Sequence, residues 1–510
     1  MALARCYAMS LVGLEGQLVE VQCDISSGLP GLSFTGLPDA SVLEARERVR
    51  SAVVNSGASW PNQKITVALL PADVRKVGSR FDLALALAVL AGAGAVPPAA
   101  VADVAWIAEL GLDGRLRPVR GVLPSALAAR RLGIRRIVVA ADNAAEAALV
   151  PGVEVRAAGD LAEIIGWLTG EGPVVPPVDA PPDAEPGERS GLDLADVAGQ
   201  MSAKRALEVA AAGGHHLSMV GTPGSGKTML AKRLPGLLPA LEDAAAMEVT
   251  AVQSVAGLLG ERPRLVRRPP LQAPHHTTSV AALVGGGSYL ARPGAISLAH
   301  HGVLFLDEAP EFAPSALDAL RQPLEDGYVV LHRGGGAVRY PARFQLVLAA
   351  NPCPCALPAE ECTCPAPARR RHDQRLSGPL LDRIDLRLRV DPVPHADLFG
   401  RREQRETSAT VAARVAHARA AASERWAGQW RVNADVPGST LRAEPWLLPR
   451  PALRPVQPFL DRGSLSARGF DRMLRLAWTV ADLAGHPVPE AGDVREALFY
   501  RTGRANSWAA

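Results

Sequence analysis

The run GTPGSGKT, residues 221–228, restricts the fold of this chain more than any other segment. It follows the short apolar stretch LSMV and precedes a helical run, which is the strand–loop–helix context that this motif requires. Glycines let backbone N–H groups converge on phosphate oxygens, and the helix that follows adds its positive end. We therefore expect an α/β fold with a nucleotide-phosphate site at this loop.

The whole loop is expected to contact the nucleotide. Lys227 would reach the outer phosphates, and the Thr228 hydroxyl would ligate magnesium. A plain glycine-rich turn is the alternative interpretation. The predicted nucleotide-binding residues are Gly221, Thr222, Pro223, Gly224, Ser225, Gly226, Lys227 and Thr228.

A second apolar strand, VLFL at 303–306, ends directly in two carboxylates, Asp307 and Glu308. Open α/β sheets bind their ligands at the carboxyl ends of the strands. Asp307 is predicted to hold magnesium together with Thr228, and Glu308 to orient and deprotonate the attacking water. An isolated Asp-Glu pair is usually solvated surface, but this pair follows a strand downstream of a phosphate loop.

A third strand, FQLVLAAN, ends at Asn351. Because asparagine is a poor strand residue, a contact with the γ-phosphate or the water is one interpretation. Turn initiation at Asn351–Pro352 is the other. The residues alone leave both open.

Longer strings around these motifs identify a family resemblance. They are DVAGQMSAKRALEVAAAGGHHLSMVGTPGSGKTMLAKRLPGLLP, APHHTTSVAALVGGGSYLARPGAISLAHHGVLFLDEAPEF, LSGPLLDRIDL and, near the N-terminus, GLPDASVLEARERVRSAVVNSG. They resemble the magnesium-chelatase-like AAA+ ATPases of the ComM/YifB type over nearly the whole chain. The resemblance implies a P-loop AAA+ αβα core with a C-terminal helical lid, ATP and magnesium as ligands, and a homo-oligomeric ring, most simply a hexamer.

The resemblance also assigns two arginines. Arg383 in LLDRIDL resembles the arginine finger that reaches the nucleotide of a neighbouring subunit, so that a monomer could not complete its own site. Arg468 in LSARGF resembles sensor 2 of the lid. Arg468, Arg472 and Arg475 fall on one helix face, for which solvation is the ordinary alternative.

Composition divides the chain. The segment 169–191 is rich in proline, glycine and acidic residues and is predicted to be an extended linker. We expect an N-terminal domain over 1–170, a linker over 171–190, the ATPase core over 191–395 and a mainly helical lid over 396–510.

The N-terminal domain resembles the Lon-protease fold, of the ribosomal-protein S5 domain 2 type, through VGSRFDLALALAVLAG and ELGLDGRLRPVRGVLPSALAARRLGIRRIVVAADN. The serine of the Lon Ser–Lys dyad would fall near Phe81–Asp82 and its lysine near Pro124. No lysine occurs between Lys76 and Lys204, so the base is missing and the domain is predicted to be catalytically inactive. Ring assembly or partner contact is the expected role.

Cysteines gather in one loop between Asn351 and Arg383. Four thiolates there could close on zinc or another soft metal, although the Cys-x-Cys spacing is tighter than usual. A metal-free loop rigidified by prolines is the alternative. The clustered residues are Cys353, Cys355, Cys362 and Cys364, and the other two cysteines are Cys6 and Cys23.

Three adjacent histidine pairs also occur, at 215–216, 275–276 and 300–301. We do not expect them to bind metal, because adjacent side chains diverge and no third ligand is evident.

DNA is the expected substrate, since the resemblance extends to ComM-type helicases that drive branch migration in recombination and transformation, with recombination proteins as partners. The basic runs ERPRLVRRPP and ARRRHDQR suit a phosphate backbone, as do Arg333 and Arg339 beside the glycine turn of a predicted hairpin. A net charge of +3 favours no partner. The alternatives are a magnesium-chelatase motor subunit and a protein-remodelling ATPase, for which only Tyr289 and Tyr328 could grip peptide.

We expect a cytoplasmic protein without membrane contact. The N-terminus lacks an apolar run followed by a small-residue cleavage site. Residues 83–102 carry no charge, but Pro97–Pro98 would interrupt a membrane span, and a buried helix over 82–91 is favoured. In that compartment the thiols are reduced.

Overall fold

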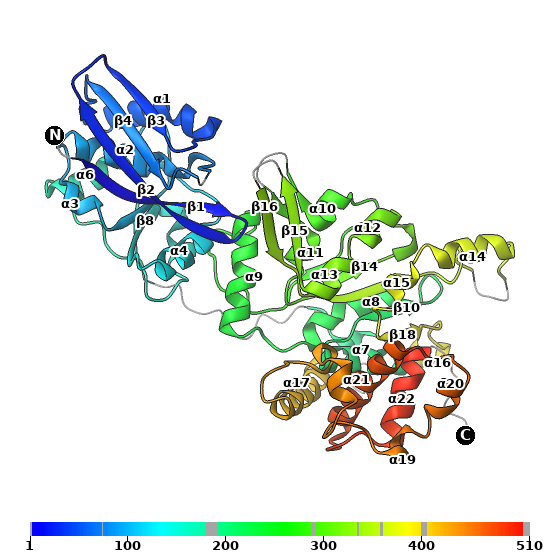
Figure 1. Cartoon of the computed structure of the whole chain (residues 1–510). Coiled ribbons are helices and arrows are strands. Elements are labelled where there is room, and N and C mark those ends of the chain that lie inside the picture. The colour runs from blue at the N-terminus through cyan, green and yellow to red at the C-terminus, as the bar shows by residue number, and fades with distance from the viewer. Residues whose placement is uncertain are drawn as a thin grey trace.

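The protein is described by a computed structural model and is elongated, with an N-terminal α/β domain, a central parallel sheet and a C-terminal helical region (Figure 1). The residues that the structure describes are 3–73, 75–179, 191–287, 291–333, 336–357, 361–398 and 405–502. Among them, no helix combines the length and the apolar character needed to cross a bilayer.

A mixed sheet forms the framework of the N-terminal domain. In spatial order its strands are β3 (Gly31–Thr35), β4 (Lys64–Leu70), β2 (Glu15–Ser26), β1 (Ala4–Val12), β5 (Val104–Ile107), β8 (Arg136–Ala140) and β9 (Glu154–Ala158). β2 pairs antiparallel with both β1 and β4, and the other neighbours are parallel. Alternate residues of β2, such as Val19, Val21 and Cys23, are fully buried, as expected of a strand with one face on the core.

Helices cover this sheet. They are α1 (Ala40–Asn55), α2 (Asp82–Gly92), α3 (Pro98–Val101), α4 (Val122–Arg131), α5 (Ala144–Ala147) and α6 (Leu161–Thr169), and a small ladder of β6 (Glu109–Leu110) with β7 (Leu116–Arg117) lies beside them. Every residue of α2 from Asp82 to Ala91 is buried, which confirms the prediction of a buried helix. Arg48 of α1 donates 2.9 Å and 3.2 Å hydrogen bonds to the Asp82 carboxylate and so compensates its burial.

The first part of the predicted linker lies along the N-terminal domain. Val178 donates its backbone N–H to the Val155 carbonyl of β9 at 2.8 Å, and the Val175 side chain is buried. Residues 180–190 of that segment lie outside the described residues.

The central sheet is parallel throughout. In spatial order its strands are β11 (Leu271–Gln272), β14 (Val303–Leu306), β17 (Gln345–Ala350), β10 (Leu217–Val220) and β18 (Leu386–Arg389). All residues of β14 and β17 are buried, which explains their continuous apolar sequences. The mixed α/β class with a parallel core sheet is therefore confirmed.

Helices and hairpins surround this sheet. The helices are α7 (Met201–Gly213), α8 (Lys227–Arg233), α9 (Asp243–Ala256), α10 (Val280–Val284), α11 (Ala295–Leu298), α12 (Pro314–Asp318), α13 (Arg321–Asp326), α14 (Ala366–Gln374), α15 (Gly378–Leu381) and α16 (His395–Leu398). The predicted hairpin is confirmed as β15 (Tyr328–Arg333) with β16 (Gly336–Pro341), although Gly334, Gly335 and the Arg333 side chain lie outside the described part. β12 (Gly285–Gly286) and β13 (Arg292–Pro293) form a shorter ladder.

The C-terminal helices share one apolar core with the central sheet. They are α17 (Ser408–Arg425), α18 (Gly438–Leu441), α19 (Arg450–Leu453), α20 (Gln457–Asp461), α21 (Ala467–Ala484) and α22 (Ala491–Thr502). α17 and α21 pack on α7, and one cluster of buried residues runs from Met219 of β10 to Met473 of α21. The C-terminal helices are thus anchored on the sheet whose strand β10 leads into the loop at 221–228.

Among the described residues, the N-terminal domain contacts the central region at α9 and at the hairpin. α4 packs against α9, where the buried carboxylate of Glu146 accepts a hydrogen bond from Ser254 and another, at 2.9 Å, from the Leu123 backbone. The turn between β1 and β2 meets the hairpin, since a Cβ atom at Gly13 would lie 2.8 Å from a Val338 methyl group.

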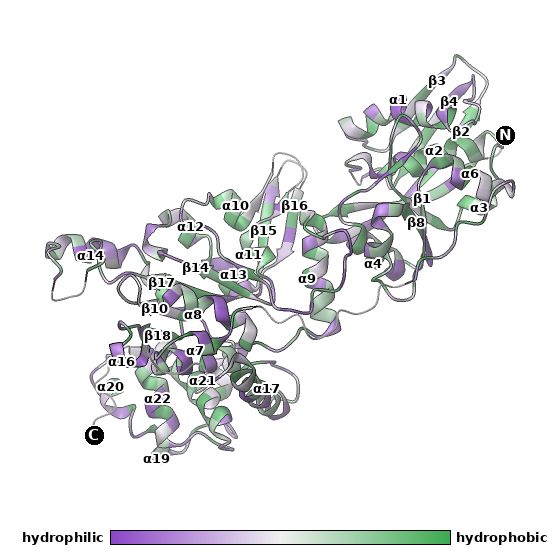
Figure 2. Ribbon diagram, turned by 180° about the vertical axis from the view of Figure 1, so that it is seen from behind, coloured by the Kyte–Doolittle hydropathy of each residue, from purple (hydrophilic) through white to green (hydrophobic). Residues whose placement is uncertain are grey.

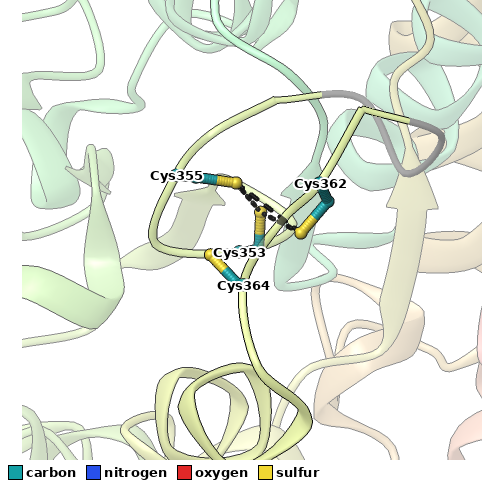
Figure 3. A group of neighbouring side chains, drawn as sticks. All are labelled: Cys353, Cys355, Cys362 and Cys364. Carbon is teal, nitrogen blue, oxygen red and sulfur yellow. Dashed lines mark hydrogen bonds between the residues drawn. The ribbon is translucent and has the colours of Figure 1, made fainter.

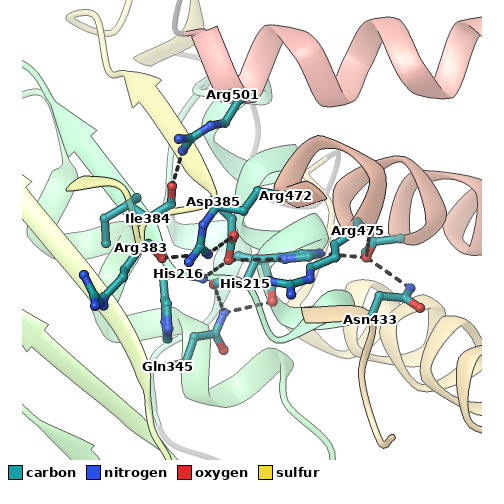
Figure 4. A network of polar contacts seen from close by, with 12 residues as sticks. His215, His216, Gln345, Arg383, Ile384, Asp385, Asn433, Arg472, Arg475 and Arg501 are labelled. Atoms are coloured by element: carbon teal, nitrogen blue, oxygen red, sulfur yellow. Dashed lines mark hydrogen bonds and ion pairs between the residues drawn. The ribbon is translucent and has the colours of Figure 1, made fainter. Parts of the chain in front are cut away.

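A buried carboxylate joins the lid to the segment after α15 (Figure 4). Asp385 accepts a 2.6 Å hydrogen bond from Arg472 of α21 and a 3.2 Å bond from the His216 backbone. Arg472 also donates to the Arg383 carbonyl at 3.0 Å, and Arg501 of α22 donates to the Ile384 carbonyl at 2.6 Å. Burial would raise the pKa of Asp385, but Arg472 and the neighbouring histidines outweigh it and hold that pKa well below its usual range.

We predict that Asp385→Asn destabilises the protein by about 3–5 kcal/mol, because it removes the buried countercharge of the largely covered Arg472 guanidinium. The low folded-state pKa of Asp385 means that its contribution is complete above an unfolded-state pKa of about 3.9 and is lost as the pH falls further. Urea unfolding followed by tryptophan fluorescence should therefore show a difference from wild type at pH 7 that shrinks below about pH 4. Asp461→Asn, on the exposed face of α20, is the control and should unfold like wild type; equal midpoints for all three proteins would contradict the prediction.

Candidate nucleotide-binding site

The predicted site residues converge because of strand order. β17 lies between β14 and β10, with Leu306 opposite Leu348 and Val220 opposite Ala350. The residues after these strands, Asp307, Asn351 and the phosphate loop, therefore emerge at one edge of the sheet.

The loop itself requires glycine. A Cβ atom at Gly221 would lie 2.2 Å from the Val390 carbonyl oxygen, so no larger residue fits there. Gly226 has φ +94° and directly precedes α8, a backbone conformation that favours glycine.

Lys227 lies inside the loop. Its ammonium donates to the carbonyls of Gly221 and Thr222 at 2.7 Å and 2.9 Å and to Asn351 Oδ1 at 3.3 Å. Burial lowers the pKa of Lys227, and the Asp307 and Glu308 carboxylates oppose that effect. The Asn351 side chain thus faces the phosphate loop, which favours its phosphate-site interpretation over a role in the turn alone.

The two predicted magnesium ligands are in contact. The Thr228 hydroxyl donates to Asp307 Oδ2 at 2.6 Å. A hydroxyl and a carboxylate are hard oxygen donors of the kind that Mg²⁺ prefers beside nucleotide phosphates, so the residues present fit that ion.

Glu308 is paired with His276, a residue that the sequence pattern did not assign to this site. Its carboxylate is 53% exposed and lies 3.3 Å from Nδ1 of His276. His276 follows β11, the sheet neighbour of β14. Because β11 is only two residues long, its sequence shows no strand pattern. The position of His276 beside the second carboxylate of the site could therefore not be predicted from the sequence.

A cleft of about 740 Å³ opens beside the phosphate loop. Its walls come from the ends of β10, β17 and β18 and from the start of the cysteine loop, and include Thr222, Asn351, His372 and Val390.

The hydrogen bonds and the ion pair of the Arg383 side chain are with α13 and α15. The guanidinium pairs with Glu325 of α13 and donates to the Pro379 carbonyl at 2.6 Å. Its Nε atom is buried without a hydrogen-bond partner. With these contacts the Arg383 side chain is 12% exposed.

The arginines on α21 do not share one solvated face. Arg468 is exposed and makes no hydrogen bond or ion pair with any described residue. Arg472 instead pairs with the buried Asp385, and Arg475 donates to the Val436 carbonyl at 2.7 Å. The helix turns these two inward because α21 packs against the core on that side.

Two histidines of one pair do converge, contrary to the expectation that adjacent side chains diverge and lack a third ligand. Both His300 and His301 lie within 3.0 Å of Glu248 Oε2. The Arg343 backbone N–H donates to Nδ1 of His300, and burial lowers the pKa of His300, so its neutral ring carries the proton on Nε2. That nitrogen donates to Glu248 and offers no lone pair to a metal.

The four clustered cysteines are brought together (Figure 3). Their sulfur atoms all lie within 4.8 Å of one another, at the mouth of the loop between β17 and α14.

In the N-terminal domain Ser79 donates to the Glu109 carboxylate, and Lys76 donates to the Pro71 carbonyl. Arg80 donates to Ser125 at 3.2 Å, next to the position expected for the dyad lysine. Part of the chain is 26% identical over 196 residues to the Lon protease of Rhizobium meliloti, covering 36% of this chain and 24% of the relative. This weak similarity supports a Lon-like N-terminal region.

Family models match most of the chain. "Magnesium chelatase, subunit ChlI" matches residues 193–398, "Subunit ChlI of Mg-chelatase" matches 21–143 and "Magnesium chelatase, subunit ChlI C-terminal" matches 405–501.

Full-length relatives agree with these matches. An uncharacterized protein of Mycobacterium tuberculosis is 52% identical over 504 residues, which is 98% of this chain and 99% of the relative. Competence protein ComM of Haemophilus influenzae is 40% identical, with 98% of both chains covered. The uncharacterized protein YifB of Escherichia coli is 40% identical, covering 98% of this chain and 97% of the relative. The chain therefore belongs to the magnesium-chelatase-like ComM/YifB family and is an ATPase-type enzyme.

Proposed function

We propose that this chain is a ring-forming, magnesium-dependent AAA+ ATPase that acts on DNA, as a helicase or branch-migration motor in recombination or transformation. The observation that carries the ATPase part is the convergence of Lys227, Thr228, Asp307 and Asn351 at one edge of the sheet. DNA as substrate is supported by exposed arginines and by a full-length relative named as a competence protein.

Each residue of the site then has a task. The loop N–H groups and Lys227 bind the phosphates, Thr228 and Asp307 hold magnesium, and Asn351 contacts the γ-phosphate or the water. The bound ion neutralises charge on the phosphates. Glu308, whose Oε2 atom lies 3.3 Å from Nδ1 of His276, accepts the proton of the attacking water.

We predict that Glu308→Gln retains ATP binding but lowers turnover by about 10²–10⁴-fold, because an amide cannot take up the water's proton. Phosphate release reports the turnover, and fluorescence of a bound ATP analogue reports the affinity. Glu361→Gln, in the cysteine loop, changes the same exposed side chain away from the strand ends and should leave both values unchanged. Turnover near wild type in Glu308→Gln would remove Glu308 from this role.

We infer the ring from the proposed role of Arg383 in a neighbouring subunit's site. In its own chain this guanidinium pairs with Glu325 rather than with the phosphate loop. A neighbouring subunit could place a nucleotide where Arg383 exchanges Glu325 for the γ-phosphate, and several subunits would then complete one another's sites. Arg468, exposed on the first turn of α21, is proposed as sensor 2, and the boundaries 1–170, 171–190, 191–395 and 396–510 are proposed for the domains.

We predict that Arg383→Ala subunits mixed into wild-type rings depress ATP hydrolysis more steeply than their fraction, because each one disables a neighbour's site. The measurement is hydrolysis rate against mixing ratio at constant total protein. Arg450→Ala, an exposed arginine on α19, is the matched control and should leave the rate unchanged at every ratio. A linear decline with Arg383→Ala would contradict action across the interface.

Three parts of the surface are suited to a phosphate backbone. The segment after α9 exposes Arg262, Arg264 and Arg268, and α14 exposes a run of arginines at 369–371. Figure 2 shows α14 as a mostly hydrophilic helix, and in Figure 1 it lies away from the N-terminal domain. Arg339 is exposed on the hairpin.

The position of one aromatic residue, Tyr328, weakens the protein-remodelling alternative. Tyr328 is the first residue of β15, at the base of the hairpin, and the Arg339 guanidinium covers its ring at 3.6 Å. Tyr289 lies outside the described residues. A covered ring at the base of a hairpin is poorly placed to grip a peptide.

The chelatase alternative is favoured by the names of all three family models, including the one that matches residues 21–143. A chelatase motor is therefore compatible with the presence of the N-terminal domain.

We predict that forked or Holliday-type DNA raises the ATPase rate, and that replacing all three arginines at 369–371 by alanine weakens this DNA response and lowers its salt dependence by about three phosphate contacts. The control replaces Arg115, Arg131 and Arg135, exposed in the N-terminal domain, and so removes the same charge. A rate indifferent to DNA but raised by a protein partner would favour the chelatase or remodelling alternative.

A further inference from the structure

The loop between β17 and α14 gathers its sulfur atoms at the spacing of a metal site. Cys353 and Cys355 have sulfurs 3.0 Å apart, and Cys362 lies 3.5 Å and 3.6 Å from them. All four cysteines are free thiols. A tetrahedral metal bound to four thiolates at about 2.3 Å keeps the sulfurs about 3.8 Å apart, so the four atoms need only small shifts (Figure 3).

This segment has no apolar core to fold on. Of the described side chains in 353–357 and 361–374, only those of Cys353 and His372 are buried, and Leu357 is 41% exposed. None of these residues belongs to a hydrophobic cluster of the described structure. Small units without a core depend on a cross-link or a structural metal for a defined conformation.

We propose that the four cysteines hold one zinc ion, which fixes the conformation of residues 353–357 and 361–374. The donor set is purely thiolate, which suits a soft tetrahedral ion rather than magnesium or calcium. The bound tetrathiolate carries net negative charge, and the exposed arginines at 369–371 follow it within the same segment.

The cysteine site is connected to the edge of the central sheet at which the proposed nucleotide-binding residues lie. Cys353 follows Asn351 in the chain after a single proline, and His372 of α14 returns to donate its Nε2 proton to the Asn351 carbonyl at 3.1 Å. Asn351 in turn contacts Lys227. With the loop closed by zinc, the backbone of Asn351 is held from both sides, so the ion acts as a positioning device for the site. This second part rests on the proposed ATPase function.

Metal analysis of full-length wild-type protein, purified without chelators, tests the site directly. We expect one zinc per chain, with thiol reagents reacting slowly at four of the six cysteines until the ion is removed. Cys355→Ser and Cys362→Ser should lose the ion, whereas Cys23→Ala, in the core of the N-terminal domain, should keep it. Wild-type protein without stoichiometric metal, or with disulfides among the four cysteines, overturns the proposal.

Trypsin digestion reports the conformation of the segment between β17 and α15 in the wild-type protein, so this test does not depend on whether a variant folds. Cleavage after the exposed arginines at 369–371 should accelerate when a zinc-selective chelator strips the wild-type protein. Added zinc should restore protection and added magnesium should not, while circular dichroism stays constant. Cleavage at an unchanged rate after stripping would show that the ion does not fix this segment.

The link to Asn351 is tested by kinetics. Stripping zinc in the presence of excess magnesium should lower kcat while leaving the KM for ATP nearly unchanged, and zinc should restore kcat. His372→Ala should lower kcat in the same way with zinc retained. Zinc-loaded protein that never hydrolyses ATP would refute the proposed function and leave the metal site standing. An active enzyme whose kcat ignores zinc would refute the link alone.

Discussion

The register of the central parallel sheet is the constraint on which the rest of the structure depends. Because β17 is inserted between β14 and β10, the segments that follow these strands share one edge, although they are far apart in the chain. All ten residues of β14 and β17 are buried, so a slip by one residue would exchange the side chains that pack on the two covered faces of the sheet. Lys227, Asp307 and Asn351 meet as a consequence.

The lid and the segment that carries Arg383 are coupled by the buried carboxylate of Asp385. Arg472 bridges this carboxylate and the Arg383 carbonyl, while Arg501 holds the next carbonyl. A movement of α21 or α22 would therefore displace the backbone at Arg383. In the ring that we propose, such a connection would let a movement of α21 on one nucleotide adjust the arginine offered to the next.

Two elements beside the nucleotide site differ in their support. The hairpin packs in an apolar cluster through Val329, Leu331 and Tyr340, whereas none of the described residues of α14 belongs to such a cluster. The turn at Gly13 of the N-terminal domain also meets the hairpin, and α14 follows the loop in which the four cysteines gather. Both adjoin strands that lead into the site, so partners bound there can influence it through the backbone of β17. The N-terminal domain is placed to support the hairpin through its turn at Gly13.

The sequence by itself determined the α/β class, the phosphate loop, the strand-end carboxylates, the buried helix at 82–91 and the hairpin, because each is encoded by a continuous local pattern. The tertiary structure decided what depends on neighbours distant in the chain. It placed Asn351 against Lys227, turned Arg472 and Arg475 inward, and set His276 beside Glu308 from a strand too short to show a pattern. It also brought two histidines together on Glu248, since only packing defines which side chains share a space.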